Sequence, residues 1–365
     1  MPFFRKKEYL SSASLNSLAW KRFRKNKLGM ISLSFIVLIL LISILGYLIT
    51  PDPTPFANDQ HLELGLKKPG ERAIFVKIPK EMTMEQRGWL EQMLFGRHPD
   101  HLLLPVVDDQ VEWTDGSGNT KRYSPEELLS KIQGAEIISA RFWLGTDRFG
   151  RDVLSQLIIG SRVSLSVGFI SVAISLVFGI SLGALGGYYR GRTDNFIVWL
   201  INVIWSVPTL LLVIAITFAL GKGFWQVFVA VGLTMWVEVA RVVRGQVLSI
   251  REKEYVEAGR ALGFSDARII FRHILPNIMG IIIVISAANF ASAILLEAGL
   301  SFLGMGVQPP VPSWGSMIKE NYPYIILDYA YLAILPGLAI MMLVLSFMLI
   351  GNALRDALDV RTVSF

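Results

Sequence analysis

Long apolar runs alternate with polar segments over most of the chain. A helix needs about 20 apolar residues to cross a bilayer, and six runs approach or exceed that length. The fourth begins near Phe224, and the others cover residues 28–50, 163–189, 196–221, 274–296 and 329–354. The pattern predicts an all-α integral membrane protein with six transmembrane helices.

Basic residues beside the first apolar run predict its orientation. Residues 1–27 are rich in lysine and arginine, whereas 28–50 is uncharged, and positive charge beside a span stays on the cytoplasmic side. The run exceeds the roughly 7 to 15 apolar residues of a cleaved signal peptide, so we expect a retained first transmembrane helix. Six crossings then place the tail 355–365, with Arg355 and Arg361, in the cytoplasm as well.

Residues 51–140 contain no run able to span a membrane and have the mixed composition of a soluble domain. Capping boxes at Thr83 and Ser124 predict two short helices, and 106–123 predicts a hairpin that turns near Asp115. We therefore expect a small α+β insert outside the cytoplasm. A membrane-tethered sensor or enzyme domain is an alternative interpretation of this insert.

Two histidines of the insert, His98 and His101, lie three residues apart and could bind a metal ion. Pro99 interrupts the helix that would align them, and no third ligand is evident. Solvated loop histidines explain the pair better, so we expect no metal site.

The segment 141–162 combines a turn with an amphipathic pattern. Thr146 or Asp147 is a suitable helix cap, and the aromatic side chains suit a membrane interface. We expect an interfacial amphipathic helix here, followed by a transmembrane domain of five helices over 160–354.

Small residues and a proline predict details of the spans. Gly179, Gly183 and Gly187 are four residues apart, so they form a strip on one helical face against which another helix can pack closely. Pro208 lies within 196–221 and predicts a bend in that span.

Ionisable residues in or near the spans are functional candidates by default. Glu238 and Arg241 are three residues apart near the end of the fourth run, so they share a helical face and can pair, and Glu297 ends the fifth run. A gating or structural ion pair is one interpretation. The other is an ion-coupled secondary transporter or channel that uses Glu297 and Glu238.

A polar segment, residues 251–276, separates the fourth and fifth runs and is too charged to lie in lipid. Gly263 can take the left-handed conformation that ends one short helix, and Ser265 can cap a second. Both helices are expected on the cytoplasmic surface of the membrane. Small residues there would let another protein approach closely: Ala258, Gly259, Ala261 and Gly263.

Composition excludes several classes of function. The 365 residues are 53% hydrophobic and 18% charged, with mean hydropathy +0.50 and no cysteine, so disulfides and thiolate chemistry are absent. The net charge of +6 lies beside the apolar runs, which indicates membrane topology rather than nucleic-acid binding. No phosphate-binding loop, GxSxG or HExxH motif occurs. We therefore expect no enzyme, cofactor or metal in this chain, and energy supplied by a partner protein.

The 251–276 segment resembles the cytoplasmic signature of type I permease subunits of ABC importers, particularly the second permease of oligopeptide, dipeptide and nickel systems. The matching residues are Glu257-Ala258-Gly259, Gly263 and His273-Ile274-Leu275-Pro276, where Gly259 and His273 replace an alanine and an isoleucine of the family pattern. Further similarity lies in LGTDRFGRDVLSQLIIGSR, ALGGYYRG, LSFLGMGVQPPVPSWG and GNALRDALDVR.

This resemblance implies the type I permease fold and a set of partners. A second permease would complete the translocation path for peptides or similar solutes in the bacterial inner membrane. Two cytoplasmic ATPases would use ATP and Mg²⁺, and an extracytoplasmic binding protein would deliver the solute. Contact with the ATPases is carried over to Glu257, Ala258, Gly259, Ala261, Gly263 and Pro276.

Overall fold

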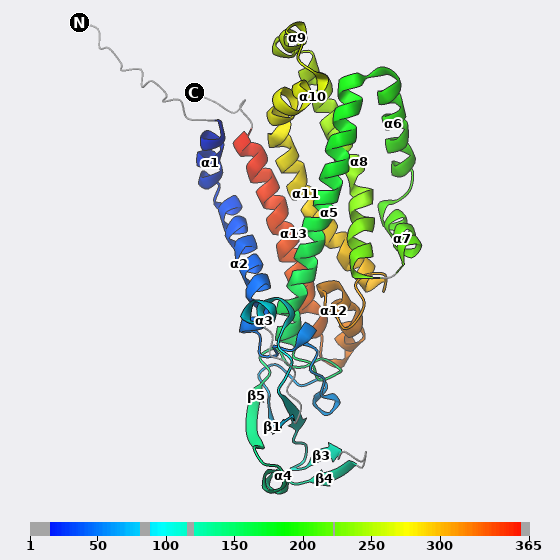
Figure 1. The fold of residues 1–365 in the computed structure, drawn as a ribbon. Coiled ribbons are helices and arrows are strands. Elements are labelled where there is room, and N and C mark those ends of the chain that lie inside the picture. Colours follow the sequence, from blue (N-terminus) through cyan, green and yellow to red (C-terminus); the bar gives the residue numbers. More distant parts are fainter. Residues whose placement is uncertain (1–14, 81–87, 115–119, 222, 359–365) are drawn as a thin grey trace, which may run out of the picture.

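The computed structural model describes residues 15–80, 88–114, 120–221 and 223–358. Its helices form an elongated bundle, and a small region of strands lies at one end (Figure 1). We call that end of the bundle the insert end. The opposite end contains the first helix α1 (Leu15–Lys25), the helix α9 (Glu254–Ala261) and the last turns of α13 (Tyr331–Leu358).

Five helices of the described residues are long and apolar enough to cross a membrane. These helices coincide with apolar runs of the sequence. A helix is required there because the hydrocarbon interior of a bilayer leaves no water to pair with backbone polar groups. These helices are α2 (Lys27–Ile49), α5 (Val153–Tyr189), α8 (Phe224–Arg251), α11 (Leu275–Phe302) and α13 (Tyr331–Leu358).

A sixth crossing follows from the packing of α5 against α8. The hydroxyl of Ser171 donates to the carbonyl of Phe228, and Gly187, four turns further along α5, lies against Val247. The two helices therefore run parallel. The chain between them must return to the insert end, and it does so through α6 (Gly191–Trp205) and α7 (Thr209–Leu220).

The break between α6 and α7 is sharper than the predicted bend at Pro208. The two helices meet at 92°, and residues 206–208 belong to neither. Proline disfavours helical geometry in the residue before it and has no N–H to donate. The single bent span expected over 196–221 is therefore two short helices.

The predicted glycine strip is confirmed as the α5–α8 contact. A Cβ atom on Gly187 would lie 2.8 Å from both the Arg244 carbonyl oxygen and Val247 Cβ, and Gly183 lies equally close to Val243. Glycine thus permits close packing of the two helix backbones where these residues meet α8.

The insert is a small α+β region, as predicted. Its antiparallel sheet has the order β2-β1-β5, and a separate hairpin pairs β3 with β4. Two short helices, α3 and α4, complete it. The bounds are β1 Arg72–Pro79, α3 Trp89–Phe95, β2 His101–Pro105, β3 Val111–Thr114, β4 Thr120–Tyr123, α4 Pro125–Lys131 and β5 Glu136–Arg141.

Local signals in the insert have mixed outcomes. The capping box at Ser124 is confirmed, because Glu127 N donates to Ser124 Oγ and Ser124 N donates to Glu127 Oε2, each at 3.2 Å. The hairpin is also confirmed, although its turn at Asp115 lies outside the described residues. The capping box at Thr83 lies outside them too.

The interfacial amphipathic helix expected over 141–162 is not a separate element. The chain leaves β5 at Arg141, forms a loop, and then enters α5 at Val153, which continues without interruption into the span. Asp152 caps it, rather than Thr146 or Asp147, by accepting from Ser155 N at 2.8 Å. The amphipathic pattern reflects the part of α5 that packs against α2 and the insert.

Candidate functional site

The 251–276 segment forms a helical corner at the end of the bundle remote from the insert (Figure 1). Helix α9 (Glu254–Ala261) is followed by Gly263, whose φ of +79° is the predicted left-handed conformation. Ser265 then caps α10 (Asp266–Ile269) by accepting from Arg268 N at 3.4 Å. Both local predictions are confirmed.

The prediction of a short second helix in this segment is wrong. A π-helical turn (Ile270–Ile274) joins α10 to α11, so that one helix runs from Asp266 to Phe302. Pro276 lies in the first turn of α11 and has no N–H for the carbonyl of Arg272. The wider turn just before it accommodates that missing bond.

Polar contacts and buried side chains hold this corner against the bundle. Tyr188, near the end of α5, forms a 2.6 Å hydrogen bond with the carboxylate of Asp266, and the Arg260 guanidinium faces the Tyr188 ring at 5.1 Å. Val256 and Ile269 are buried in the same apolar cluster as residues of α5, α8 and α11. The corner is therefore a fixed feature of the fold rather than a loose loop.

Most residues named for the coupling site lie on the surface of this corner, and one lies beneath it. Gly259 is buried, where an added Cβ would lie 3.4 Å from the Phe264 ring. Its small size therefore serves packing inside the segment rather than approach by another protein. The exposed residues are Glu257, Ala258, Ala261, Gly263 and Pro276.

Two exposed apolar side chains of this surface were not singled out by sequence reasoning. Leu262 is 73% exposed and Phe271 is 71% exposed. Both residues lie within a strongly charged segment. A large apolar residue among charged ones was the signal in the sequence that could have identified them as surface contacts. Exposed apolar groups of this size mark a protein-contact surface when they adjoin charged residues.

The predicted Glu238–Arg241 pair does not form an ion pair in the part of the chain that the structure describes. Arg241 instead lies over the Trp205 ring at 3.5 Å, and both Glu238 and Arg241 are exposed in the single chain. Because α8 continues to Arg251, Glu238 lies near the middle of the helix rather than in its last two turns.

Glu297 lies in the last two turns of α11, near the end of the span as expected, and its side chain is fully buried. Ser301 Oγ donates to Glu297 Oε1 at 2.7 Å, and Ser313 Oγ lies 3.3 Å from Ser301 Oγ. Ser313 begins α12 (Trp314–Asn321), so this polar cluster fastens the loop after α11 to the bundle. The geometry favours a structural role.

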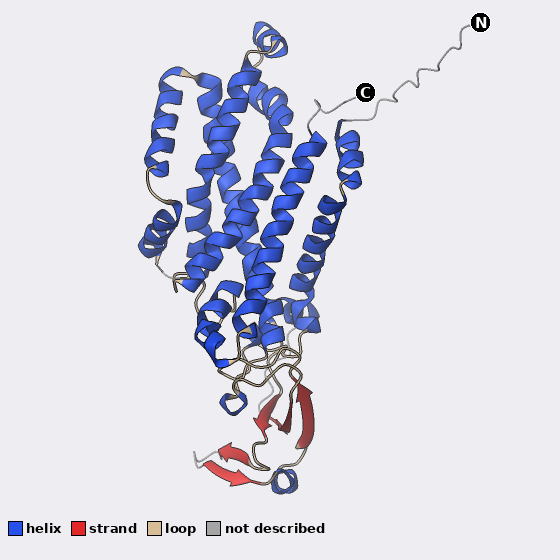
Figure 2. Cartoon of the chain, turned by 180° about the vertical axis from the view of Figure 1, so that it is seen from behind, coloured by secondary structure: helices blue, strands red, loops and turns tan. Residues whose placement is uncertain are grey.

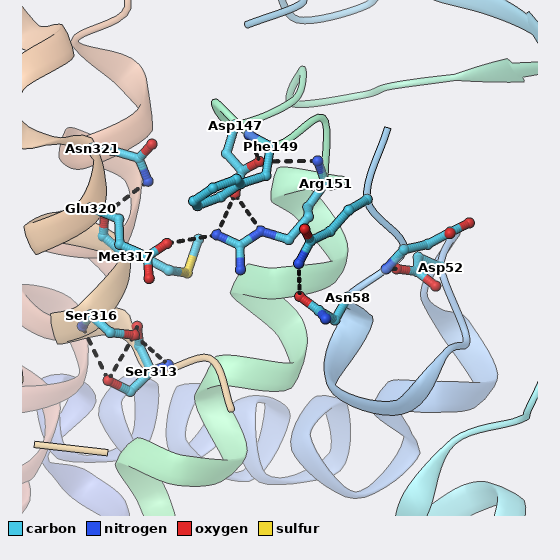
Figure 3. A network of polar contacts seen from close by, with 12 residues as sticks. Asp52, Asn58, Asp147, Phe149, Arg151, Ser313, Ser316, Met317, Glu320 and Asn321 are labelled. Carbon is cyan, nitrogen blue, oxygen red and sulfur yellow. Dashed lines mark hydrogen bonds and ion pairs between the residues drawn. The ribbon is translucent and has the colours of Figure 1, made fainter. Parts of the chain in front are cut away.

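A second polar network lies at the insert end (Figure 3). The Arg151 guanidinium lies between two carboxylates, 2.6 Å from Asp147 Oδ2 and 2.6 Å from Glu320 Oε2. Burial acts to lower the pKa of Arg151, but the two carboxylates outweigh it and raise the pKa. Glu320 belongs to α12 and the other two residues to the loop before α5, so Arg151 joins these elements.

Two aspartates near this network carry a desolvation cost. Burial raises the pKa of Asp152 despite the hydrogen bonds from Ser155, and Asp152 Oδ1 has no partner among the described residues. Burial likewise raises the pKa of Asp52, which accepts from the backbone N–H groups of Thr54 and Asp59. Both residues fix the junctions between the insert and the spans.

Within the described ranges, no group of three or more histidine, aspartate or glutamate side chains is placed to hold a metal ion. The described residues thus form a bundle of membrane-spanning helices with an ordered polar corner at one end. Residues 175–364 match the family of binding-protein-dependent transport system inner membrane components. The chain belongs to this family and has its type I permease fold.

A second match covers residues 14–69, which correspond to the N-terminal TM domain of oligopeptide transport permease C. Residues 70–174, which include most of the insert, lie in neither match. Ion-coupled transport through Glu297 and Glu238 gains no support from these matches.

The chain is similar to several characterised permeases. It is 41% identical over 237 residues to the glutathione transport system permease protein GsiD of Pectobacterium atrosepticum, covering 65% of this chain and 78% of the relative. It is 40% identical to the dipeptide transport system permease protein DppC of Alkalihalophilus pseudofirmus, covering 65% and 77%. The chain is thus a permease subunit of an ABC transport system.

Among solved structures, the chain is similar to the inward-facing methionine ABC transporter MetNI. The TM-score is 0.47 with 20% sequence identity, and the match covers 55% of this chain and 96% of that one.

Proposed function

We propose that this subunit works in an ATP-driven importer of peptides or similar small solutes. The relatives named above are permeases for glutathione and dipeptides, and another is the oligopeptide transport system permease protein OppC of Bacillus subtilis, 38% identical over 65% of this chain and 76% of the relative. A second permease completes the translocation path as a heterodimer.

The 251–276 segment is the proposed site for the ATPases. The single observation that carries this is the exposed apolar pair Leu262 and Phe271 on an ordered, charged corner. Two cytoplasmic ATPases, which use ATP and Mg²⁺, each receive one such corner in a surface cleft. Closure of the ATPases then tilts the spans, because α10 and α11 form one helix.

Glu257 pairs with the ATPase rather than within the corner. Its side chain is exposed, and it takes part in no ion pair of the described residues. By contrast, Asp266 is committed to Tyr188. An exposed carboxylate on the same corner as Leu262 supplies part of the charged rim that surrounds an apolar contact.

With the ATPases at the 251–276 segment, the chain has one orientation in a bacterial inner membrane. The basic helix α1, the end of α13 and the 251–276 segment share one end of the bundle, which is the cytoplasmic end by the distribution of positive charge. Both termini are then cytoplasmic. The insert is extracytoplasmic, on the side from which a binding protein delivers solute.

The test compares Leu262→Asp with Ile326→Asp. Both side chains are highly exposed, at 73% and 87%, but Ile326 lies in the turn after α12 at the insert end. We expect Leu262→Asp to reduce the amount of ATPase that co-purifies with the permease and to reduce ATP-dependent uptake of a labelled dipeptide. Ile326→Asp keeps the ATPase bound.

Gly263→Val supplies a second variant. Its Cβ meets no atom within 4 Å, but its φ of +79° strains any larger residue, so the corner changes shape while the bundle stays folded. We expect ATP hydrolysis to continue without uptake. Normal uptake by both Leu262→Asp and Gly263→Val would show that this corner is not the ATPase site.

A further inference from the structure

Helix α3 of the insert carries an unusual amount of exposed apolar surface. Trp89 is 69% exposed, and Leu90 and Leu94 are each 52% exposed. Glu91 and Gln92 lie on another side of the helix. In water this surface would be unfavourable, because apolar side chains are more stable when they are removed from water.

The depth of α3 along the bundle is set by one arginine. The guanidinium of Arg162 in α5 donates to the carbonyl oxygens of Ser43 and Ile44 in α2, at 2.5 and 2.8 Å. It also donates to the carbonyl oxygens of Met93 and Leu94 in α3, both at 2.7 Å. The end of α3 therefore lies at the same level as Ser43 and Ile44.

That level is inside the apolar span of α2. Helix α2 continues to Ile49, five residues beyond Ile44, which corresponds to about 8 Å at the rise of an α-helix. Arg97 N donates to the Pro53 carbonyl at 2.8 Å, so the chain after α3 is fastened where it leaves α2. Figure 1 shows α3 beside this end of α2.

Helix α2, beside which α3 lies, is mostly exposed in the chain. Only 17% of the apolar window of α2 is buried within the chain, and Leu41, Leu45 and Leu48 are exposed. We propose that α3 is an interfacial membrane helix, and that Trp89, Leu90 and Leu94 lie in the lipid leaflet on the insert side. Amphipathic helices of this kind lie about 5 to 10 Å deep, at the boundary between headgroups and acyl chains.

Lipid is the occupant because the exposed surface is continuous with a transmembrane helix and carries tryptophan, which favours membrane interfaces. The insert is then held to the membrane at three places: where it leaves α2, where it enters α5, and through α3. The sheet and the β3–β4 hairpin lie further from the bundle (Figure 2). The inference is independent of the transported solute and of the ATPase contact.

The absence of cysteine from the whole sequence permits a direct test. Leu90→Cys is labelled with a nitroxide in the complete transporter, reconstituted in vesicles of bacterial phospholipid, and collision rates with oxygen and with a water-soluble nickel chelate are measured. Leu48→Cys on α2 serves as the lipid-facing control, and Glu126→Cys on α4 as the water-facing control. Both residues are exposed.

We expect the ratio of oxygen to nickel-chelate collisions at position 90 to match position 48 and to exceed position 126. A ratio equal to that at position 126 places α3 in water and overturns the proposal. Low collision rates with both reagents also overturn it, because a protein then covers α3. If Leu90→Cys does not assemble, Leu94→Cys reports the same surface.

Discussion

Removing the Arg151 guanidinium should destabilise the insert end of the bundle by leaving a buried charge without its partner. The Asp147 side chain is 2% exposed and the Arg151 side chain 7%. Arg151→Met keeps the length and apolar stem of the side chain but removes both ion pairs. Asp147 still accepts from Phe149 N at 2.9 Å and Arg151 N at 3.0 Å.

The expected loss follows from those contacts. Breaking a buried ion pair from one side costs about 3 to 5 kcal/mol, and the two backbone hydrogen bonds that remain place this case near the lower limit, about 3 kcal/mol. Glu320 adds little, because its side chain is 21% exposed and water can solvate it. The effect should appear in thermal unfolding of the purified complex, followed by tryptophan fluorescence.

A double variant separates the charge from the packing. If the uncompensated Asp147 carboxylate causes the loss, Arg151→Met with Asp147→Asn unfolds at a higher temperature than Arg151→Met alone. If the two substitutions add, so that the double variant is the least stable, the reasoning about the buried carboxylate is refuted. The hydrogen bonds of Asp147 to the backbone would then be the main contribution.

Three further outcomes follow from single contacts. In Gly187→Leu the new Cβ would lie 2.8 Å from the Arg244 carbonyl oxygen, and overpacking of this kind should lower the free energy of unfolding by at least about 1 to 3 kcal/mol. Normal assembly in size-exclusion chromatography would contradict the α5–α8 packing. Asp152→Asn retains the cap on Ser155, and burial raises the pKa of Asp152. The ionised aspartate is therefore unfavourable at pH 7, so the asparagine variant should be the more stable there. This advantage should decline as the pH falls through the folded-state pKa toward the lower pKa of the unfolded chain. Thermal scans at several pH values would refute this if the difference stayed constant. Arg162→Met loses hydrogen bonds to four carbonyl oxygens, and hydrogen bonds to a charged group contribute about 1.5 to 3 kcal/mol each. We therefore expect faster proteolysis within the insert. An unchanged digestion pattern would show that α3 is held by other contacts.

Apolar length and local capping chemistry carried most of the fold prediction. The six crossings, the α5 glycine strip and the left-handed Gly263 each depend on a requirement that acts within one helix or one turn. Ser124 and Ser265 cap helices for the same reason. Such requirements are visible in a single sequence because the residues that meet them are neighbours.

Other features depend on contacts between distant residues and were not predictable. Helical spacing places Glu238 and Arg241 on one side of α8, but the Trp205 ring of α6 takes the guanidinium. Arg151 and Glu320 are separated by 169 positions, and no local pattern joins them. The candidate site was similarly incomplete, because burial of Gly259 and exposure of Leu262 are set by how α9 packs on the bundle.

Helix α5 is a rigid rod between the two ends of the molecule. Its 37 residues extend about 55 Å. At one end Asp152, directly after Arg151, caps the helix, and at the other end the Tyr188 hydroxyl is hydrogen-bonded to Asp266. A tilt of about 5° over that length displaces one end by about 5 Å relative to the other. A small rotation at the 251–276 segment therefore becomes a displacement at the insert end without any change in the helix itself.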